Sequence, residues 1–214
     1  MIGKYVPMVE FKNKKVLVIA PHMDDEVIGC SGTLMSVRNE IGELIVVHMS
    51  DDECRIGEFE YIREMLCIDE HFRLGCEDGY IRLFYKEAVN KLIEIIQSKQ
   101  IDIVFIPHAE DNHVDHMATH EIAMDAIGKA RYWSTEYKTC HIDEVLEYEV
   151  WSLQKNVSVC IDITKYIDMK KQLMNYYASQ LKFDYEKFIE HLNGYRGLSF
   201  NKHGYMECFG LVKI

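Results

Sequence analysis

The chain has 214 residues, of which 48% are hydrophobic and 28% are charged, and this length accommodates one α/β domain with a sizeable core. Its formal net charge of -11 at pH 7 argues against nucleic acid or an anionic membrane as the main partner, because polyanion binding needs a basic surface. Seven single cysteines without a CxxC pair are typical of reduced thiols. No signal peptide or membrane-spanning run is evident, so we expect a soluble, cytoplasmic protein.

The first predicted element is a buried strand that ends in a polar turn. Residues 16–20 (VLVIA) form a short apolar run, which is the pattern of a strand buried on both faces of a parallel sheet. Pro21 ends this strand, and a helix is expected after the turn with Ser31 as its N-cap. The turn itself carries His22, Asp24, Asp25 and Glu26. Strand-to-helix turns of this kind are where open parallel sheets bind ligands.

Strands and helices continue to alternate along the chain. In the first half we expect strands at 43–49, near 72–74 and at 101–106, and helices at 53–67, at 85–98 and from Met117 onward. In the second half we expect a loop over the active face at 131–145, strands at 146–153, 157–163 and 205–212, helices at 166–181 and 184–192, and a glycine-rich basic loop at 194–204. The alternation predicts an α/β fold, a single Rossmann-like domain over residues 1–214, with a mostly parallel sheet and helices on both faces.

The first polar turn has the composition of a metal site. One imidazole and two carboxylates within four residues suit a divalent metal, and they leave a further carboxylate for acid and base chemistry. The alternative is a cluster of acids at a helix N-terminus, where the helix dipole favours negative charge. That alternative accounts for one or two carboxylates, but it needs neither His22 nor a third acid.

A second polar cluster follows Pro107, at the end of another predicted strand. It contains His108, Asp111, His113, Asp115, His116 and His120. A three-ligand site with an open position needs a neutral donor beyond His22 and one carboxylate, and this cluster can supply it. His116 and His120 have the spacing of a zincin-like pair, but that motif requires Glu directly after the first His, where Met117 stands. We therefore favour one ligand from this helix and expect His120 to be a packed or polar residue.

The two clusters together carry a recognisable pair of motifs. Residues 21–26 read PHMDDE, residues 113–116 read HVDH, and residues 31–34 read SGTL. These segments resemble the LmbE and PIG-L family of metal-dependent N-acetylglucosaminyl deacetylases, whose motifs read (A/P)HPDDE and HxDH. Met23 replaces the usual proline, at a position that is not a ligand. The resemblance implies that His22, Asp25 and His116 bind one divalent metal, that Asp24 is the general base, and that His113 is oriented by Asp115.

The resemblance also implies a reaction and a class of substrate. The expected metal is zinc, with ferrous iron as the alternative. A bound metal helps amide hydrolysis because it lowers the pKa of its water from about 15.7 towards about 7 and polarises the acyl oxygen. His113 is expected either to stabilise the oxyanion or to act as the acid. The implied substrate is a small amino sugar, an N-acetylglucosamine unit that is part of a glycoside or linked to a nucleotide or a lipid. The sequence is compatible with a homo-oligomer as well as with a monomer.

Several side chains are candidates for contacts with the rest of the substrate. Of Arg55, Arg63 and Arg196, we favour Arg55 for an anionic aglycone because it follows a strand end. Glu207, Tyr132 and Trp133 are further candidates for shaping the pocket.

Two other functions are considered beside the deacetylase. One is a metal-dependent amidase or phosphoesterase acting on a non-sugar or conjugate substrate. A phosphoesterase would more often use two metals, with Asp51, Asp111 and His120 as additional ligands. The other is a non-catalytic nucleotide-binding domain, which is disfavoured because the first turn has carboxylates and no glycine pair to admit a phosphate.

Overall fold

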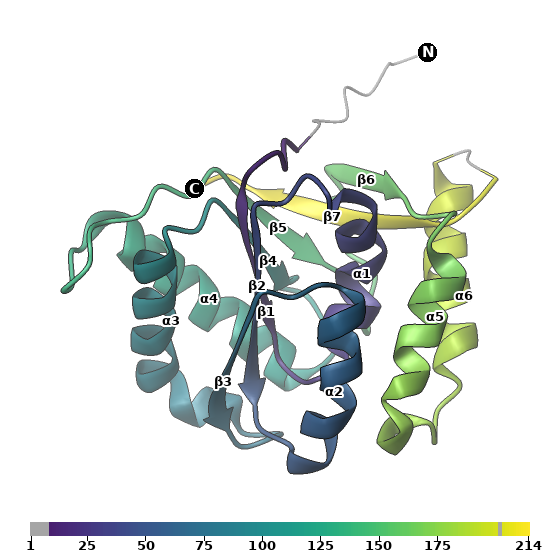
Figure 1. The fold of residues 1–214 in the computed structure, drawn as a ribbon, viewed down its shortest axis with the longest axis horizontal. Coiled ribbons are helices and arrows are strands. Elements are labelled where there is room, and N and C mark those ends of the chain that lie inside the picture. Colours follow the sequence, from purple (N-terminus) through teal and green to yellow (C-terminus); the bar gives the residue numbers. More distant parts are fainter. Residues whose placement is uncertain (1–8, 201–202) are drawn as a thin grey trace.

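The computed structural model describes residues 9–200 and 203–214, which form one seven-stranded sheet (Figure 1). The strands are β1 (Lys15–Ala20), β2 (Glu43–Ser50), β3 (Glu70–Cys76), β4 (Ile103–Pro107), β5 (Glu144–Tyr148), β6 (Val159–Asp162) and β7 (Met206–Val212). Their order across the sheet is β3-β2-β1-β4-β5-β7-β6. The strands β1 to β5 pair in parallel, whereas β7 is antiparallel to both β5 and β6. The predicted mostly parallel sheet is confirmed.

Helices cover both faces of the sheet, as predicted (Figure 1). They are α1 (Asp25–Val37), α2 (Glu53–Met65), α3 (Tyr85–Lys99), α4 (Val114–Tyr132), α5 (Ile167–Tyr176) and α6 (Tyr185–Ser199), with 3-10 turns at Ile81–Phe84 and Ala178–Gln180. Successive side chains of β1 point to opposite faces. Val16 and Val18 join the core under α1, α2, α5 and α6, while Leu17 and Ile19 join the core under α3 and α4.

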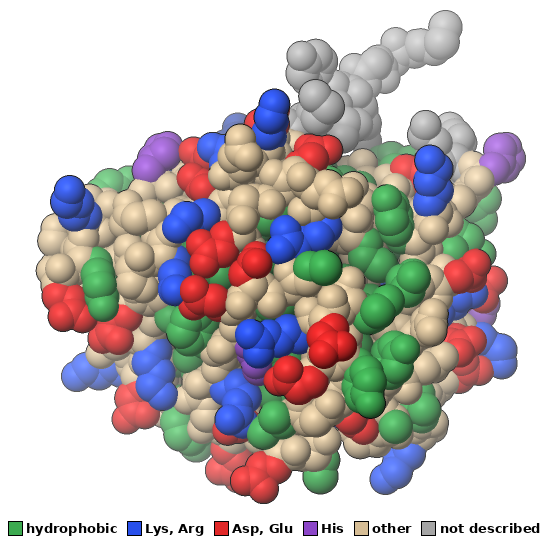
Figure 2. Space-filling view, in the orientation of Figure 1, with side chains coloured by type: hydrophobic (Ala, Val, Ile, Leu, Met, Phe, Trp, Pro, Cys, Tyr) green, Lys and Arg blue, Asp and Glu red, His purple; other side chains and the backbone are tan. Residues whose placement is uncertain are grey.

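The surface carries charges of both signs and a localised hydrophobic band. Figure 2 shows acidic and basic side chains intermixed over much of one face, with hydrophobic side chains gathered along α5. Tyr61 of α2 stacks on Tyr176 of α5 with ring centroids 5.1 Å apart. None of the helices in the described part of the chain is long and apolar enough to cross a membrane.

The first helix begins at the acidic motif itself, so the predicted N-cap at Ser31 is wrong. Asp24 has a φ of 135°, and its carbonyl oxygen accepts hydrogen bonds from the amides of Val27 and Ile28. The chain therefore turns into α1 directly after β1. Ser31 lies within the helix, where its hydroxyl donates to the Val27 carbonyl oxygen at 2.8 Å. The early start places Asp25 in the first turn of α1.

The irregular segment before β5 does not lie over the candidate site, which corrects that prediction. The helix α4 continues to Tyr132, and the loop that follows leads to the amino end of β5. An ion pair of 2.6 Å joins Asp143 in this loop to Lys14, which precedes β1. Because β1, β4 and β5 are parallel, this end of the sheet is opposite the carboxyl ends that carry both motifs. Tyr132 and Trp133 are exposed there and do not shape the pocket.

The segment 194–204 is also more regular than predicted. The helix α6 continues to Ser199, and residues 201–202 lie outside the described part. Arg196 is a buried residue of this helix, and its guanidinium donates to both carboxylate oxygens of Glu149. It is therefore a core ion-pair partner, which removes Arg196 from the three arginines considered for an anionic aglycone.

A buried ion pair interrupts the hydrogen bonding of α1. The carboxylate of Glu207 accepts hydrogen bonds from the amides of Gly32 and Thr33 at 2.9 and 2.7 Å. The ammonium group of Lys170 donates to Glu207 and, at 2.7 Å, to the Ile28 carbonyl oxygen, which would otherwise accept from Gly32 in a regular helix. These charged side chains are almost fully buried. Glu207 thus positions α1 and does not shape the pocket as predicted.

The close packing of α1 on the sheet makes Gly29 a sensitive position. A Cβ atom there would lie 2.3 Å from Cδ2 of Tyr148, whose buried hydroxyl donates to the Ile19 carbonyl oxygen at 2.9 Å. Gly29→Ala is expected to destabilise the protein by about 1–3 kcal/mol through overpacking, measured as the free energy of unfolding in urea. Gly128→Ala in α4 is the control, since nothing lies within 4 Å of its Cβ position, and it should be neutral or stabilising by up to about 1 kcal/mol. Equal unfolding midpoints for the two variants would contradict the packing argument.

Candidate metal centre and active site

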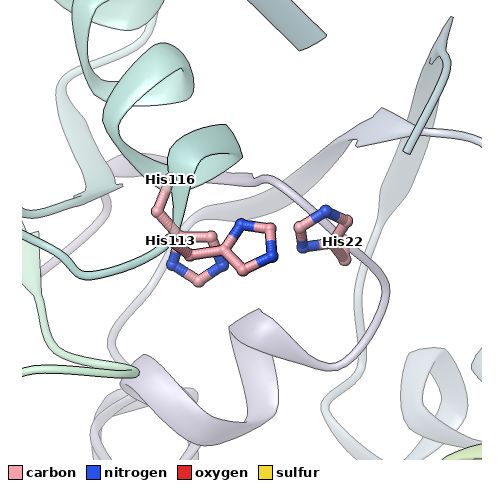
Figure 3. A group of neighbouring side chains, drawn as sticks. All are labelled: His22, His113 and His116. Carbon is pink, nitrogen blue, oxygen red and sulfur yellow. The ribbon is translucent and has the colours of Figure 1, made fainter. Parts of the chain in front are cut away.

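The two sequence motifs meet at the carboxyl ends of neighbouring strands. His22 follows β1, and His113 and His116 lie at the start of α4 after β4, and these two strands pair directly in the sheet. Figure 3 shows the three imidazole rings turned toward one another. Their ring centroids are 4.9 to 5.6 Å apart. Motifs that are about ninety residues apart in the chain thus form one site.

Asp25 lies between two of these histidines. Its Oδ2 atom is 3.1 Å from Nδ1 of His22 and 3.2 Å from Nε2 of His116. All three side chains are buried. The fold therefore brings together the three residues that the motifs suggest as metal ligands. Possible ligand atoms of His22, His113 and His116 also lie within 4.8 Å of one another, as do those of His22, Asp78 and Asp115.

The environment of His116 suits a divalent cation. The ring is fully buried and neither nitrogen makes a hydrogen bond, although Asp25 and Asp111 oxygens lie 3.2 and 3.4 Å from them. Burial lowers the pKa of His116, but the two carboxylates outweigh it and raise the pKa to about 9. The surroundings thus favour positive charge at a side chain whose nitrogens are without hydrogen bonds. Imidazole and carboxylate are suitable ligands for zinc or ferrous iron, so these residues fit the expected metal.

Removing His116 should therefore abolish most metal binding. His116→Ala is expected to weaken zinc affinity by about 100-fold or more, because changes to groups that merely support ligands already cost about 10- to 100-fold. His120→Ala is the matched control from the same helix, since Nδ1 of His120 is 3.1 Å from the Pro107 carbonyl oxygen and outside both donor groups. Competition titration with a zinc chelator measures both affinities. Equal losses in the two variants would contradict the assignment.

Asp24 lies in the pocket beside the proposed ligands. Burial, followed by the negative charge of Asp25, raises the pKa of its carboxyl well above the ordinary value. Its backbone amide donates to Oε2 of Glu26 at 3.1 Å, and Nη1 of Arg55 is 3.4 Å from its Oδ2 atom. A carboxyl group with a raised pKa in a small pocket is suited to accept and return a proton.

Arg55 lies at the pocket but is already paired. Its Nη1 donates to the Met23 carbonyl oxygen at 2.9 Å, and its Nε is 3.1 Å from Asp52. Together with Asp24, these contacts fix the guanidinium beside the first motif. Its charge is thus largely balanced by this chain's own carboxylates.

The carboxylate of Asp115 lies against His22, while its backbone contacts His113. Its Oδ2 atom is 3.1 Å from Nε2 of His22 and accepts from the Gly79 amide at 2.6 Å. His113 is the N-cap of α4, and its Nδ1 accepts from the Asp115 amide at 3.2 Å. Burial and then the charges of His116 and His22 lower the pKa of His113. The amide of Asp115 therefore orients His113, and its carboxylate orients His22.

The third acid of the first motif anchors the turn from inside the protein. Glu26 is fully buried, and its carboxylate accepts from the Tyr177 hydroxyl at 2.6 Å and lies 3.0 Å from Nε2 of His48. Nδ1 of His48 is in turn 2.8 Å from Nε2 of His71. Burial, followed by the charges of His48 and Arg73, lowers the pKa of His71 to about 3. This network holds Asp24 through the Glu26 carboxylate.

The pocket also contains residues that sequence reasoning missed. It has a volume of about 130 Å³. Besides the motif residues and Arg55, its walls include Asp78, Trp151, Gln180 and Tyr185. Asp78 precedes Gly79, whose φ of 82° marks a tight turn. The Oδ1 atom of Asp78 is 3.2 Å from Nε2 of His22. In the sequence, the pair Asp78 and Gly79 indicated a turn. It did not indicate that this turn lies close to the end of β1.

Other candidate residues are not gathered at the pocket. Arg63 of α2 is half-buried, and its Nη1 atom is 3.8 Å from Oε2 of Glu60. Of the additional ligands considered for two metals, Asp51 pairs with Arg73 and His120 contacts Pro107, whereas Asp111 lies near His116. These three do not form a common donor group.

The fold and the motifs agree with known proteins. The PIG-L family, described as GlcNAc-PI de-N-acetylase, matches residues 17–127. The chain is similar to N,N'-diacetylchitobiose deacetylase from Pyrococcus horikoshii (24% identity, TM-score 0.81, covering 93% of this chain and 84% of that chain). It is similar to the conserved protein TT1542 from Thermus thermophilus (24% identity, TM-score 0.80, covering 92% of this chain and 93% of that chain). It is also similar to GalB, the 4-carboxy-2-hydroxymuconate hydratase from Pseudomonas putida (18% identity, TM-score 0.80, covering 94% of this chain and 97% of that chain).

These structural likenesses are at low identity and show the fold, which hosts a hydratase as well as a deacetylase. The family match is more specific, because it spans more than half of the chain and includes both motifs. The chain therefore belongs to the PIG-L family of LmbE-like deacetylases.

Proposed function

We propose that this protein is a metal-dependent hydrolase that removes the N-acetyl group from an N-acetylglucosamine-type amino sugar. The observation that carries this proposal is the buried group of His22, Asp25 and His116. His22 and Asp25 line one small pocket together with Asp24. Membership of the family supports the reaction type. The similar structure of a diacetylchitobiose deacetylase supports an amino sugar as the substrate class.

His22, Asp25 and His116 would hold the metal, for which zinc is proposed and ferrous iron is the alternative. When bound, the metal makes water more acidic, from a pKa of about 15.7 towards about 7, and polarises the acyl oxygen. Asp24 takes the proton from the attacking water and returns it to the departing amine. The place of Asp24 in the pocket beside Asp25 suits both steps, because the group must hold the proton between them.

His113 is proposed to stabilise the oxygen of the tetrahedral intermediate. Its Nδ1 accepts a hydrogen bond from the Asp115 amide, so the neutral ring carries its proton on Nε2. The lowered pKa of His113 favours this neutral form. Nε2 can therefore donate to the developing oxyanion. Arg55 is proposed to orient the substrate, with its remaining donors directed to sugar oxygens.

The proposal is tested with N-acetylglucosamine, its methyl glycoside, diacetylchitobiose and N-acetylglucosamine 1-phosphate. Acetate and free amine are measured with zinc-loaded protein, with chelator-stripped protein, and after zinc is restored. We expect equal amounts of acetate and amine from at least one sugar, loss after stripping, recovery with zinc, and one metal per chain. The phosphoesterase would be favoured instead if the zinc-loaded protein binds two metals per chain, cleaves a phosphoester and cleaves no sugar amide.

A further inference from the structure

A second hollow lies beside the proposed active-site pocket. It has a volume of about 340 Å³ and is lined by the segment after β5 and by one face of α6, which runs along the right of Figure 1. Trp151 and Leu153 form the first wall, and Phe188, Leu192 and Tyr195 form the second. We call this hollow the α6 groove. The spacing of the three helix residues places them on one face of α6.

Trp151 belongs to both hollows. It lines the active-site pocket together with Tyr185, and it lines the α6 groove together with Phe188. The Trp151 ring centroid is 6.2 Å from that of Tyr185 and 5.4 Å from that of Phe188. Its backbone amide donates to Asp111, which also lies beside His116. A substrate that enters the pocket therefore meets an aromatic wall that continues into the groove.

The groove offers apolar surface that is at present exposed to water. Leu153 is 43% exposed and Tyr195 is 55% exposed. A volume of about 340 Å³ is within the range of sites for small organic molecules, about 300–1,000 Å³. Covering these side chains with an apolar group is favourable because apolar area is removed from water.

The two hollows offer few cationic side chains to an anionic group. The lining of the α6 groove contains no lysine or arginine, and its one imidazole is that of His191. Arg55 is held by Asp24 and Asp52 at the pocket, and Arg196, on the same helix as the groove, is buried against Glu149. A phosphate beside the sugar would therefore lack an unpaired cation from these residues.

We propose that the α6 groove binds an uncharged, apolar aglycone, alkyl or aryl, of the sugar whose N-acetyl group occupies the active-site pocket. This inference rests on the proposed function. The proposed substrate is a neutral N-acetylglucosaminide. It replaces the substrate with an anionic aglycone that the arginines of the sequence suggested. The sugar ring lies against Trp151, and the aglycone lies between Leu153 and the face of α6 that carries Phe188, Leu192 and Tyr195.

The test compares the binding of methyl and hexyl N-acetyl-β-glucosaminides and N-acetylglucosamine 1-phosphate to the zinc-loaded protein by calorimetry. The hexyl glycoside is expected to bind about 30-fold more tightly than the methyl glycoside, because each buried methylene contributes up to about fourfold. Leu153→Ser and Tyr195→Ser should each reduce this preference by about three- to tenfold. Both side chains are exposed, so folding should be preserved. Tyr132→Ser is the matched control, with an exposed tyrosine at the opposite end of the sheet.

The outcomes separate the groove from the proposed reaction. Deacetylation of methyl and hexyl glycosides with no hexyl preference, or tighter binding of the 1-phosphate, would overturn the groove and leave the deacetylase standing. A hexyl preference that Leu153→Ser removes, without acetate release from any sugar, would support the groove and overturn the reaction. Absence of binding by all three sugars would overturn both. A dimer that Leu153→Ser dissociates would assign the groove to a second copy of the chain and overturn the aglycone.

Discussion

Asp24→Asn is expected to lower kcat for acetate release by about 10²- to 10⁴-fold, the range for loss of a general base, while the protein still binds one metal per chain. The amide has nearly the shape of the carboxyl group but cannot take a proton from water. We propose Asp24 for proton transfer because its carboxyl lies in the pocket, whereas Asp25 contacts both buried histidines. Initial rates and metal content of the same samples measure the effect.

The control for this variant is Asp184→Asn. Asp184 is the exposed N-cap of α6 and accepts a hydrogen bond from the Lys187 amide at 3.2 Å, so its replacement should leave kcat unchanged. Full activity of Asp24→Asn would assign the base to another residue. Loss of metal together with activity would make Asp24 a ligand.

Lys170→Met is expected to destabilise the protein by about 3–5 kcal/mol, the cost of removing one partner from a buried ion pair. The carboxylate of Glu207 would stay buried, with the amides of Gly32 and Thr33 as its remaining partners among the hydrogen bonds described above. Methionine fills much of the space of the lysine stem, so the loss reports chiefly on the charge. Urea unfolding followed by circular dichroism measures the free energy of unfolding.

Two comparisons isolate this effect. Lys187→Met removes an exposed lysine that is 2.8 Å from Asp184, and it should change stability by no more than about 1 kcal/mol. The double variant Lys170→Met/Glu207→Leu should be less destabilised than the sum of its single variants, because neither charge is left alone. If Lys170→Met and Lys187→Met cost the same, the buried pair does not stabilise α1.

Local sequence patterns determined the alternating fold and both polar turns. The apolar runs at 16–20 and 101–106 predicted β1 and β4, and the structure confirms both within two residues. Buried parallel strands are readable because both faces are apolar. Since the carboxyl ends of neighbouring parallel strands lie at one edge, the motif residues that follow them could be expected to meet.

Contacts between distant residues could not be predicted in this way. Arg196 and Glu149 are 47 residues apart, and Lys170 and Glu207 are 37 apart. Each side chain alone resembled a surface charge or a pocket residue, because charged residues are usually exposed. Their pairing depends on how α6, α5 and β7 pack together. The spacing of apolar residues within each segment does not predict this packing.

The candidate site likewise contains residues that the sequence predicted and residues that only the tertiary structure identified. The sequence by itself predicted which side chains lie at the centre, because His22, Asp24, Asp25 and His116 are within short motifs that follow strands. Tertiary structure alone decided which side chains surround them. The carboxylate of Asp115 faces His22, Asp78 reaches the pocket from a turn after β3, and Trp151 joins the pocket to the α6 groove. The physical reason is that ligand types are set by composition and spacing, whereas pocket walls are set by the packing of segments that are distant in the chain.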